Sequence, residues 1–176
     1  MQRVEKKQEN GHFKVYVRDC NDSPIKEFKL NDRFMGDFQK LVKVMDDTET
    51  TKLLSDNCTE ARVVKNITAD EYVQYFYFNM PTGITDRDCV TKIIIKRTPT
   101  TYASYSESYG DELVSAQKHV IRLKKVRASF YFELYEDGTI GMEYCGRTDP
   151  NGWIPAWLVN MLAHREAKKW LKNSKN

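Results

Sequence analysis

The sequence lacks the residues and motifs by which many enzymes and metal-binding proteins are recognised. Its 176 residues include three His and four Cys, and no two Cys form a CxxC pair. We therefore expect free thiols, no metal site and no cofactor. Neither Gly-x-Ser-x-Gly, nor a glycine-rich phosphate loop, nor His-Glu-x-x-His occurs, so no catalytic motif indicates an enzyme.

Long apolar runs and a large excess of charge of one sign are also missing. The first ten residues are charged rather than apolar, unlike a signal peptide, and no stretch approaches the roughly 20 apolar residues of a transmembrane helix. Lys and Arg number 28 against 25 Asp and Glu, for a net charge of +3, which argues against a dedicated nucleic-acid binder. These absences predict a cytoplasmic protein without a nucleic-acid partner.

Aromatic residues, by contrast, are abundant: ten Tyr, eight Phe and three Trp. Such rings fill cores and also line apolar pockets. The chain length suits one domain with a sizeable core. We expect a single domain over residues 1–176, with residues 1–10 as a charged lead-in.

Hydrophobic periodicity predicts an α+β protein. Apolar residues at i, i+3, i+4 and i+7 predict a helix over 38–45, and a short second helix is expected through Leu53 and Leu54. A long last helix is expected from Pro155 to about Leu171. Strands are expected at 13–18, 25–30, 61–67, 71–80, 88–97, 100–108, 120–134 and 139–148. This order is typical of helices gathered on one face of an antiparallel sheet.

Two strand segments allow predictions about faces. In 88–97 the set Cys89, Thr91, Ile93 and Ile95 is the better candidate for the buried face. Asp137-Gly138 predicts a hairpin, and a two-residue loop would pair Tyr135 with Ile140. Both faces of this hairpin carry aromatic side chains, so the pattern leaves open which one points inward.

Three motifs in order resemble a known family, the StAR-related lipid transfer (START) domain. They are Arg87-Asp88 at the start of a strand, Val120-Ile-Arg122, and the run from Asp149 to Asn160 with its Asp-x-x-Gly-x-Ile-Pro pattern. Asn151 stands where the family has the first Gly of a Gly-Gly pair. The resemblance covers about 12–172 and is closest to bacterial-type members.

The resemblance implies a helix-grip fold, in which a curved antiparallel sheet wraps a long C-terminal helix. It also implies non-enzymatic binding, and transfer, of a lipid or other hydrophobic ligand in an internal cavity between the sheet and that helix. Relatives with the same fold include polyketide cyclases and aromatases. An inward acid–base pair, such as Glu143 with a Tyr, would favour this alternative.

Eight residues are candidates for the cavity lining, with plain core packing as the alternative for the apolar and aromatic ones. They are Arg87, Tyr75, Tyr77, Thr91, Ile93, Glu143, Trp157 and Met161. A buried Arg must be paired or hydrogen-bonded. Arg87 therefore either anchors a polar ligand group or forms a structural pair with a nearby acid, which could be Asp86, Asp88, Glu133 or Glu143.

The basic segment Arg122–Arg127 has two interpretations. Lys and Arg protect edge strands from pairing with other chains. Alternatively, the segment contacts an anionic membrane surface transiently during ligand exchange.

Overall fold

The structure is a computed structural model, and it describes residues 4–10, 13–21, 23–52, 57–149 and 151. Within these ranges, no helix has the length and apolar character needed to cross a membrane. The helix expected over 155–171 and the residues Leu53 and Leu54 lie outside the described part of the chain.

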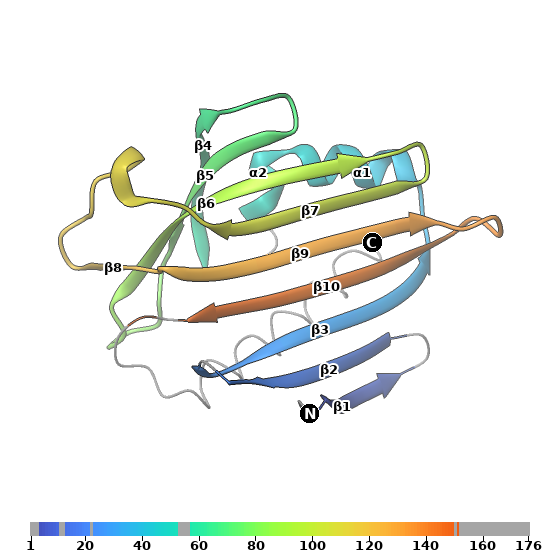
Figure 1. Cartoon of the computed structure of the whole chain (residues 1–176), viewed down its shortest axis with the longest axis horizontal. Helices are drawn as coiled ribbons and strands as arrows, with labels where there is room; N and C mark the ends of the chain where they lie inside the picture. The colour runs from blue at the N-terminus through green and yellow to red at the C-terminus, as the bar shows by residue number, and fades with distance from the viewer. Residues whose placement is uncertain (1–3, 11–12, 22, 53–56, 150, 152–176) are drawn as a thin grey trace.

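One ten-stranded sheet dominates the described residues, and its strands run in the order β1-β2-β3-β10-β9-β7-β6-β5-β4, with β8 paired to β6 (Figure 1). The strands are β1 (Val4–Asn10), β2 (Phe13–Cys20), β3 (Ser23–Met35), β4 (Cys58–Asn66), β5 (Glu71–Phe78), β6 (Asp86–Arg97), β7 (Thr101–Ser108), β8 (Val120–Arg122), β9 (Lys125–Leu134) and β10 (Thr139–Asp149). Every pair is antiparallel except β6 with β8. The helices are α1 (Phe38–Asp46), α2 (Thr48–Thr51) and the short 3-10 helix η2 (Asp111–Leu113).

The connection from β3 to β4 carries the chain across the whole sheet. After β3 it passes through α1 and α2 to the far edge strand, β4, and then returns strand by strand until β10 pairs with β3. Both helices lie behind β6 and β7 in the view of Figure 1. The sheet therefore has a face toward the helices and an opposite face toward the viewer.

Helix α1 forms where the sequence predicts it. Asp37 caps its N-terminus by accepting a hydrogen bond from the backbone N–H of Lys40 at 3.0 Å. Asp46, at its last turn, accepts one from Arg97 of β6 at 2.6 Å. The predicted apolar stripe packs against the sheet through Phe38, Leu41, Val42 and Met45. The helix thus covers one end of the sheet.

We call the face that carries the main buried cluster the inner face, and the opposite one the outer face. The sheet residues of this cluster are Val15, Leu30, Ile93, Ile95, Tyr102, Phe132, Ile140 and Met142. The prediction for β6 is confirmed, because Cys89, Thr91, Ile93 and Ile95 are all buried. Val90, which has the opposite parity, is buried as well, in a smaller cluster on the outer face.

The β9–β10 hairpin has a three-residue loop, and the predicted two-residue register is wrong. Tyr135 pairs with Thr139 through an N–H to O bond of 2.9 Å, and Ile140 pairs with Leu134. Asp137 accepts from the backbone N–H of Thr139 at 3.0 Å, and Gly138 adopts a φ of 78°. These local bonds favour a turn followed by a residue in the left-handed region, which lengthens the loop by one residue. As a result, the inner face holds Phe130 and Phe132 of β9 opposite Tyr144 and Met142 of β10.

The predicted strand over 120–134 is interrupted. Most residues of its basic segment therefore do not protect a sheet edge, which was one of the two interpretations. β8 ends at Arg122 and β9 begins at Lys125. β9 lies between β7 and β10 in the interior of the sheet. Since its backbone groups are paired on both sides, its basic residues do not shield an open edge.

The charged lead-in contains a strand. Val4–Asn10 forms β1, which pairs with β2 from Val4 opposite Arg18 to Asn10 opposite Phe13. β1 and β4 are thus the two outermost strands in the order of the sheet.

Candidate functional site

Aromatic rings from adjacent strands contact one another on the inner face. The centroids of Phe130 and Tyr144 are 4.7 Å apart, and those of Tyr102 and Phe132 are 6.3 Å apart. Both separations are typical of favourable ring pairs. This part of the sheet therefore presents an apolar wall toward the interior of the molecule.

A pair of polar residues interrupts the apolar wall. Gln74 of β5 lies directly opposite Thr91 of β6, and their side chains are 0% and 1% exposed. Among the residues that the structure describes, no group hydrogen-bonds the amide nitrogen or oxygen of Gln74 or the hydroxyl of Thr91. Leaving one buried donor or acceptor unpaired costs about 1–3 kcal/mol. Such groups are rare in native proteins, and each calls for an explanation.

Arg87 lies on the same side of β6 as Cys89 and Thr91, because the three residues are two apart along the strand. Its side chain is 3% exposed, and its guanidinium donates a hydrogen bond to the backbone carbonyl of Thr85. Burial lowers the pKa of Arg87 from its ordinary value.

Several acids that could pair with Arg87 bind other groups. Asp88 pairs with Arg122, and Glu143 pairs with Lys29 at 2.5 Å. Asp86 accepts hydrogen bonds at 2.8 Å from the Tyr77 hydroxyl and also from the backbone N–H of Met80. These two bonds lower the pKa of Asp86.

Tyr75 and Tyr77 lie on the outer face, apart from the other candidates of β5 and β6. Tyr75 lies opposite Val90, the residue before Thr91, so it points to the other face of the sheet. It is fully buried in the small outer cluster. Its hydroxyl accepts a hydrogen bond from the side chain of Gln117 at 2.7 Å. Burial raises the pKa of this hydroxyl. Because side chains alternate along a strand, Tyr75 cannot share a face with Gln74.

The remaining candidates separate further. Ile93 belongs to the inner cluster, as predicted. Glu143 lies on the outer face, because its neighbours Met142 and Tyr144 both point inward. Trp157 and Met161 lie outside the described residues. The structure therefore brings Arg87, Thr91 and Ile93 to one face and places Tyr75, Tyr77 and Glu143 on the other.

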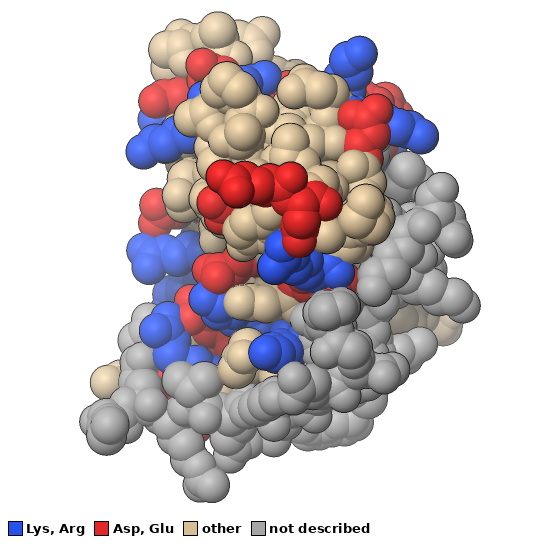
Figure 2. Space-filling view, turned by 90° about the vertical axis from the view of Figure 1, so that its right-hand side faces the viewer, with Lys and Arg blue, Asp and Glu red and all other residues tan. Residues whose placement is uncertain are grey.

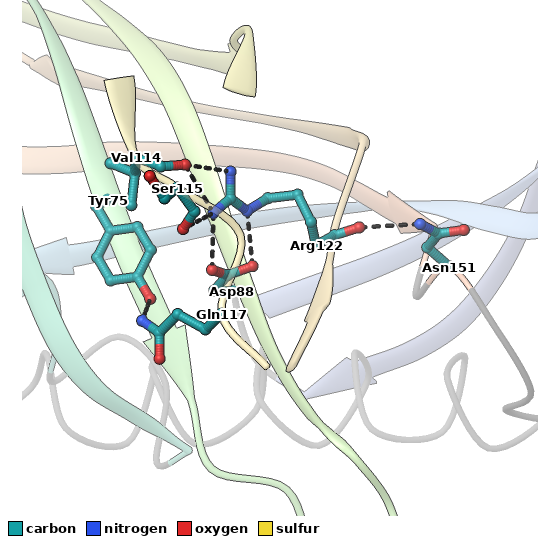
Figure 3. A network of polar contacts seen from close by, with 7 residues as sticks. All are labelled: Tyr75, Asp88, Val114, Ser115, Gln117, Arg122 and Asn151. Atoms are coloured by element: carbon teal, nitrogen blue, oxygen red, sulfur yellow. Dashed lines mark hydrogen bonds and ion pairs between the residues drawn. The ribbon is translucent and has the colours of Figure 1, made fainter. Parts of the chain in front are cut away.

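Behind the inner face lies a buried ion pair that sequence reasoning did not identify, although both residues belong to the motifs quoted above. Arg122 binds Asp88 through two hydrogen bonds of 2.7 and 2.9 Å, and both side chains are buried. The same guanidinium donates to the backbone carbonyl of Val114 at 3.2 and 3.3 Å (Figure 3). A buried ion pair is favourable only when its donors and acceptors are satisfied in this way.

Asn151 joins this network from the end of β10. Its side-chain amide donates to the backbone carbonyl of Arg122 at 2.9 Å, at the right of Figure 3. Its φ is 46°, in the left-handed region that Asn tolerates better than most residues. Asn therefore suits the position where the family has Gly, and its side chain adds a bond that Gly cannot make.

The four cysteines are free thiols, as predicted. Burial raises the pKa of the Cys58 thiol to about 11, and burial also raises that of Cys89. A thiol with a raised pKa holds little thiolate, the nucleophilic form, at neutral pH. His119 is exposed, with a φ of 64°, while His12 and His164 lie outside the described residues.

Charged side chains near the β9–β10 turn, and others at the end of β6, form ion pairs. Arg33 binds Asp137 at 2.7 Å, and Arg97 binds Asp70 at 2.9 Å. Figure 2 shows the two signs interspersed with uncharged residues over this end of the molecule. The basic groups of these two pairs are thus matched by acidic ones.

Comparison with known proteins supports this architecture. An uncharacterized protein of Pseudomonas aeruginosa is 24% identical over 154 residues, which cover 88% of this chain and 75% of that protein. Crystal structures of human STARD10 and of a STAR-related lipid transfer protein from Xanthomonas axonopodis each superpose with a TM-score of 0.82. STARD10 is 20% identical and covers 96% of this chain, which spans 71% of the STARD10 chain. The Xanthomonas axonopodis protein is 21% identical and covers 98% of this chain, which spans 96% of that protein's chain.

These likenesses confirm the predicted helix-grip fold. A model of the START domain matches residues 11–176, almost the whole chain. The chain therefore belongs to the START domain family.

Proposed function

We propose that this protein binds a lipid or another hydrophobic ligand in an internal cavity, between the inner face of its sheet and its C-terminal residues, and releases it unchanged. Proteins of the START domain family bind lipids and hydrophobic ligands. The carriage of a ligand between sites would follow from binding and release alone.

The aromatic wall of the inner face carries this proposal. Phe130, Phe132, Tyr102 and Tyr144 lie side by side there across three strands. Apolar burial is worth about 25 cal/mol per Å², so a ligand burying roughly 400 Å² would gain about 10 kcal/mol before the costs of association. An apolar wall thus supplies enough affinity without a charged anchor.

Arg87 either anchors a polar part of the ligand or holds the start of β6. If it is an anchor, Arg87→Met reduces the lipid that co-purifies and leaves the melting temperature unchanged. If it is structural, Arg87→Met lowers the melting temperature and leaves the ligand profile of the folded fraction unchanged.

The cyclase alternative gains no support from Glu143. That alternative needs an acid–base pair pointing inward, and Glu143 lies on the outer face with its carboxylate bound to Lys29. We therefore propose a binding protein rather than an enzyme.

Native mass spectrometry with lipid extraction of the purified full chain tests the proposal. We expect a co-purifying lipid, or uptake of lipid from vesicles by protein that has been stripped of it. Phe130→Ala, on the inner face, should weaken uptake about tenfold, whereas its neighbour Tyr131→Ala, which is 40% exposed on the outer face, should not. Protein that holds no lipid and takes up none would exclude the proposed function.

A further inference from the structure

We propose that a trough across the outer face of the sheet is a docking surface for another protein, and that this partner presents an acidic, amphipathic helix. The trough holds about 460 Å³ and extends over five neighbouring strands, β3, β10, β9, β7 and β6. We call it the outer trough, and its lining includes Ile94, Tyr105, Arg127, Ser129 and Cys145. This inference is independent of the proposed function, because the ligand cavity would lie on the opposite face.

The first argument is the shape of the outer trough, which has small side chains in its floor and an aromatic ring beside them. Cys145 lies opposite Ser129, and Ser129 lies opposite Tyr105, so the three form one row across adjacent strands. Ile94 continues this row opposite Tyr105. Tyr105 is 48% exposed, and Tyr is enriched among the residues that anchor protein interfaces. The hollow beside the ring therefore suits an apolar side chain of a partner.

The second argument is the charge along one side of the outer trough. Arg127 of β9 lies directly opposite Arg147 of β10, and like charges in this position are destabilising. Glu107 binds Arg127 at 2.9 Å, but these side chains are 66% and 77% exposed, so the pair contributes little and a partner can replace it. A carboxylate placed between the two guanidinium groups would offset their repulsion and accept charge-assisted hydrogen bonds. The surface therefore favours an acidic partner.

The pairing of the strands decides how such a partner binds. β10, β9 and β7 each have a neighbour on both sides, so their backbone groups are not open to an added strand. Recognition therefore uses side chains, as when a helix lies on a groove. Helical residues three or four apart are about 5–6 Å from each other, close to the spacing of about 4.8 Å between strands. A helix lying across the strands can thus place one side chain over each of them.

The arrangement of the described elements leaves room for this partner. Helices α1 and α2 both lie on the other side of the sheet (Figure 1). A second copy of this chain, centred on Arg127 and Arg147, would bring two more arginines to the pair, which is a repulsive contact. We therefore infer a different protein as the partner.

Selection from a phage library of random peptides, each about 16 residues long or about four helical turns, tests the inference on the full chain. The wild type is the target, and Ser129→Phe, which fills the floor of the outer trough, removes peptides that bind elsewhere. We expect the enriched peptides to carry Asp or Glu at helical spacing beside an apolar or aromatic residue. Replacing their acids by the corresponding amides should weaken binding at least tenfold, as measured by calorimetry. No enrichment, or enrichment of peptides without acids, would overturn the proposal.

Two arginine variants locate the bound peptide. Arg127→Ala should weaken its binding about tenfold. Arg33→Ala is the control, because Arg33 also forms an exposed ion pair on the outer face, with Asp137. Arg33 lies opposite Gly141, which is six residues from Arg147 along β10, about 20 Å at 3.3 Å per residue. The control should change the affinity less than twofold, and equal effects of the two variants would overturn the proposal.

The thiol of Cys145 gives a second, independent readout of occupancy. The bound peptide should slow alkylation of Cys145 by N-ethylmaleimide at least about fivefold, a loss of free sites that mass spectrometry of the digested protein measures. Cys20, which is partly exposed like Cys145, should react at an unchanged rate. Equal reactivity of Cys145 with and without peptide would place the peptide elsewhere and overturn the proposal. A dimer of the wild type that Ser129→Phe dissociates would also overturn it, with a second copy as the occupant.

Discussion

The two faces of the β5–β6 pair differ in how they treat buried polar groups. On the outer face such groups are paired: Tyr75 with Gln117, Tyr77 with Asp86, and Asp88 with Arg122. On the inner face, Gln74 and Thr91 lie opposite each other with unpaired polar atoms. The two faces of this strand pair therefore differ in whether these buried polar groups find hydrogen-bond partners.

The outer network also has a mechanical consequence. Arg122 and Gln117 tie the segment around Val114 to the back of β5 and β6 (Figure 3). The polar groups of the outer face thus hold a loop in place, whereas Gln74 and Thr91 on the inner face form no such bonds among the described residues. The following predictions aim to break or refine this contrast, from the largest expected effect to the smallest.

Removing one partner of the outer ion pair should have the largest effect. Arg122→Met leaves the buried carboxylate of Asp88 without its counter-charge, and we expect the free energy of unfolding to fall by about 3–5 kcal/mol. Chemical denaturation measures this. Arg127→Met is the control, because its pair with Glu107 is exposed and should contribute less than about 1 kcal/mol. A loss below 1 kcal/mol for Arg122→Met would contradict the structural role of the outer network.

The inner face should keep its thiols neutral, and this predicts a dependence of stability on pH. Cys58 lies opposite Phe78 on this face, and its pKa is raised to about 11. The folded protein therefore holds a proton that the unfolded chain releases above about pH 9, so stability falls as the pH rises from 9 to 11.

The size of this fall is about 1–2 kcal/mol by pH 10.5, if the unfolded thiol has its ordinary pKa. Urea denaturation of the wild type and of Cys58→Ala at pH 8 and pH 10.5 isolates the contribution, because Tyr and Lys titrate in both proteins. Equal losses in the two proteins would show that Cys58 is not held neutral by burial.

A single hydrogen bond on the outer face should have a smaller effect. Tyr75→Phe keeps the ring in the outer cluster and removes the hydroxyl that accepts from Gln117. We expect a loss of about 1 kcal/mol, and faster hydrogen exchange at residues 114–117. Stability that rises in Tyr75→Phe would show that this hydrogen bond does not stabilise the outer face.

Contact with a membrane, which we keep as a proposal, should respond least. Arg122 is buried and Arg127 is paired with Glu107, so Lys124 and Lys125 are the exposed basic residues of this segment that remain to attract an anionic surface. Each should contribute about 1 kcal/mol or less at low salt. In sedimentation with vesicles of increasing anionic lipid content, the double variant Lys124→Gln, Lys125→Gln should bind less than the wild type. Binding that does not depend on lipid charge or salt would contradict this proposal.

Much of the fold was predictable from local patterns. The stripe from Phe38 to Met45 forms α1, and most of the predicted strands are present. The hairpin was also predictable, but not its register, because the hydrogen bonds of Asp137 add one residue to the loop. The interruption of 120–134 depends on the pairing of β8 with β6, which no local pattern indicates.

The candidate site was predictable only in part, for a related reason. Thr91 and Ile93 share a parity within one strand, so their common face could be inferred. Tyr75 and Glu143 were placed with them across strand boundaries, where a shift of one residue moves a side chain to the opposite face. Gln74, which the register of β5 and β6 brings opposite Thr91, carried no signal that sequence reasoning used.

The sequence by itself determined the family, the order of helices and strands, and the parity of residues within each strand, because these depend on motifs and short-range periodicity. Only the tertiary structure decided which strands are neighbours, in which register they pair, and hence which polar groups are satisfied. Hydrogen bonds between distant residues such as Asp88 and Arg122 form only once the sheet has assembled. The lack of hydrogen-bond partners for Gln74 and Thr91 among the described residues is likewise a property of the assembled sheet.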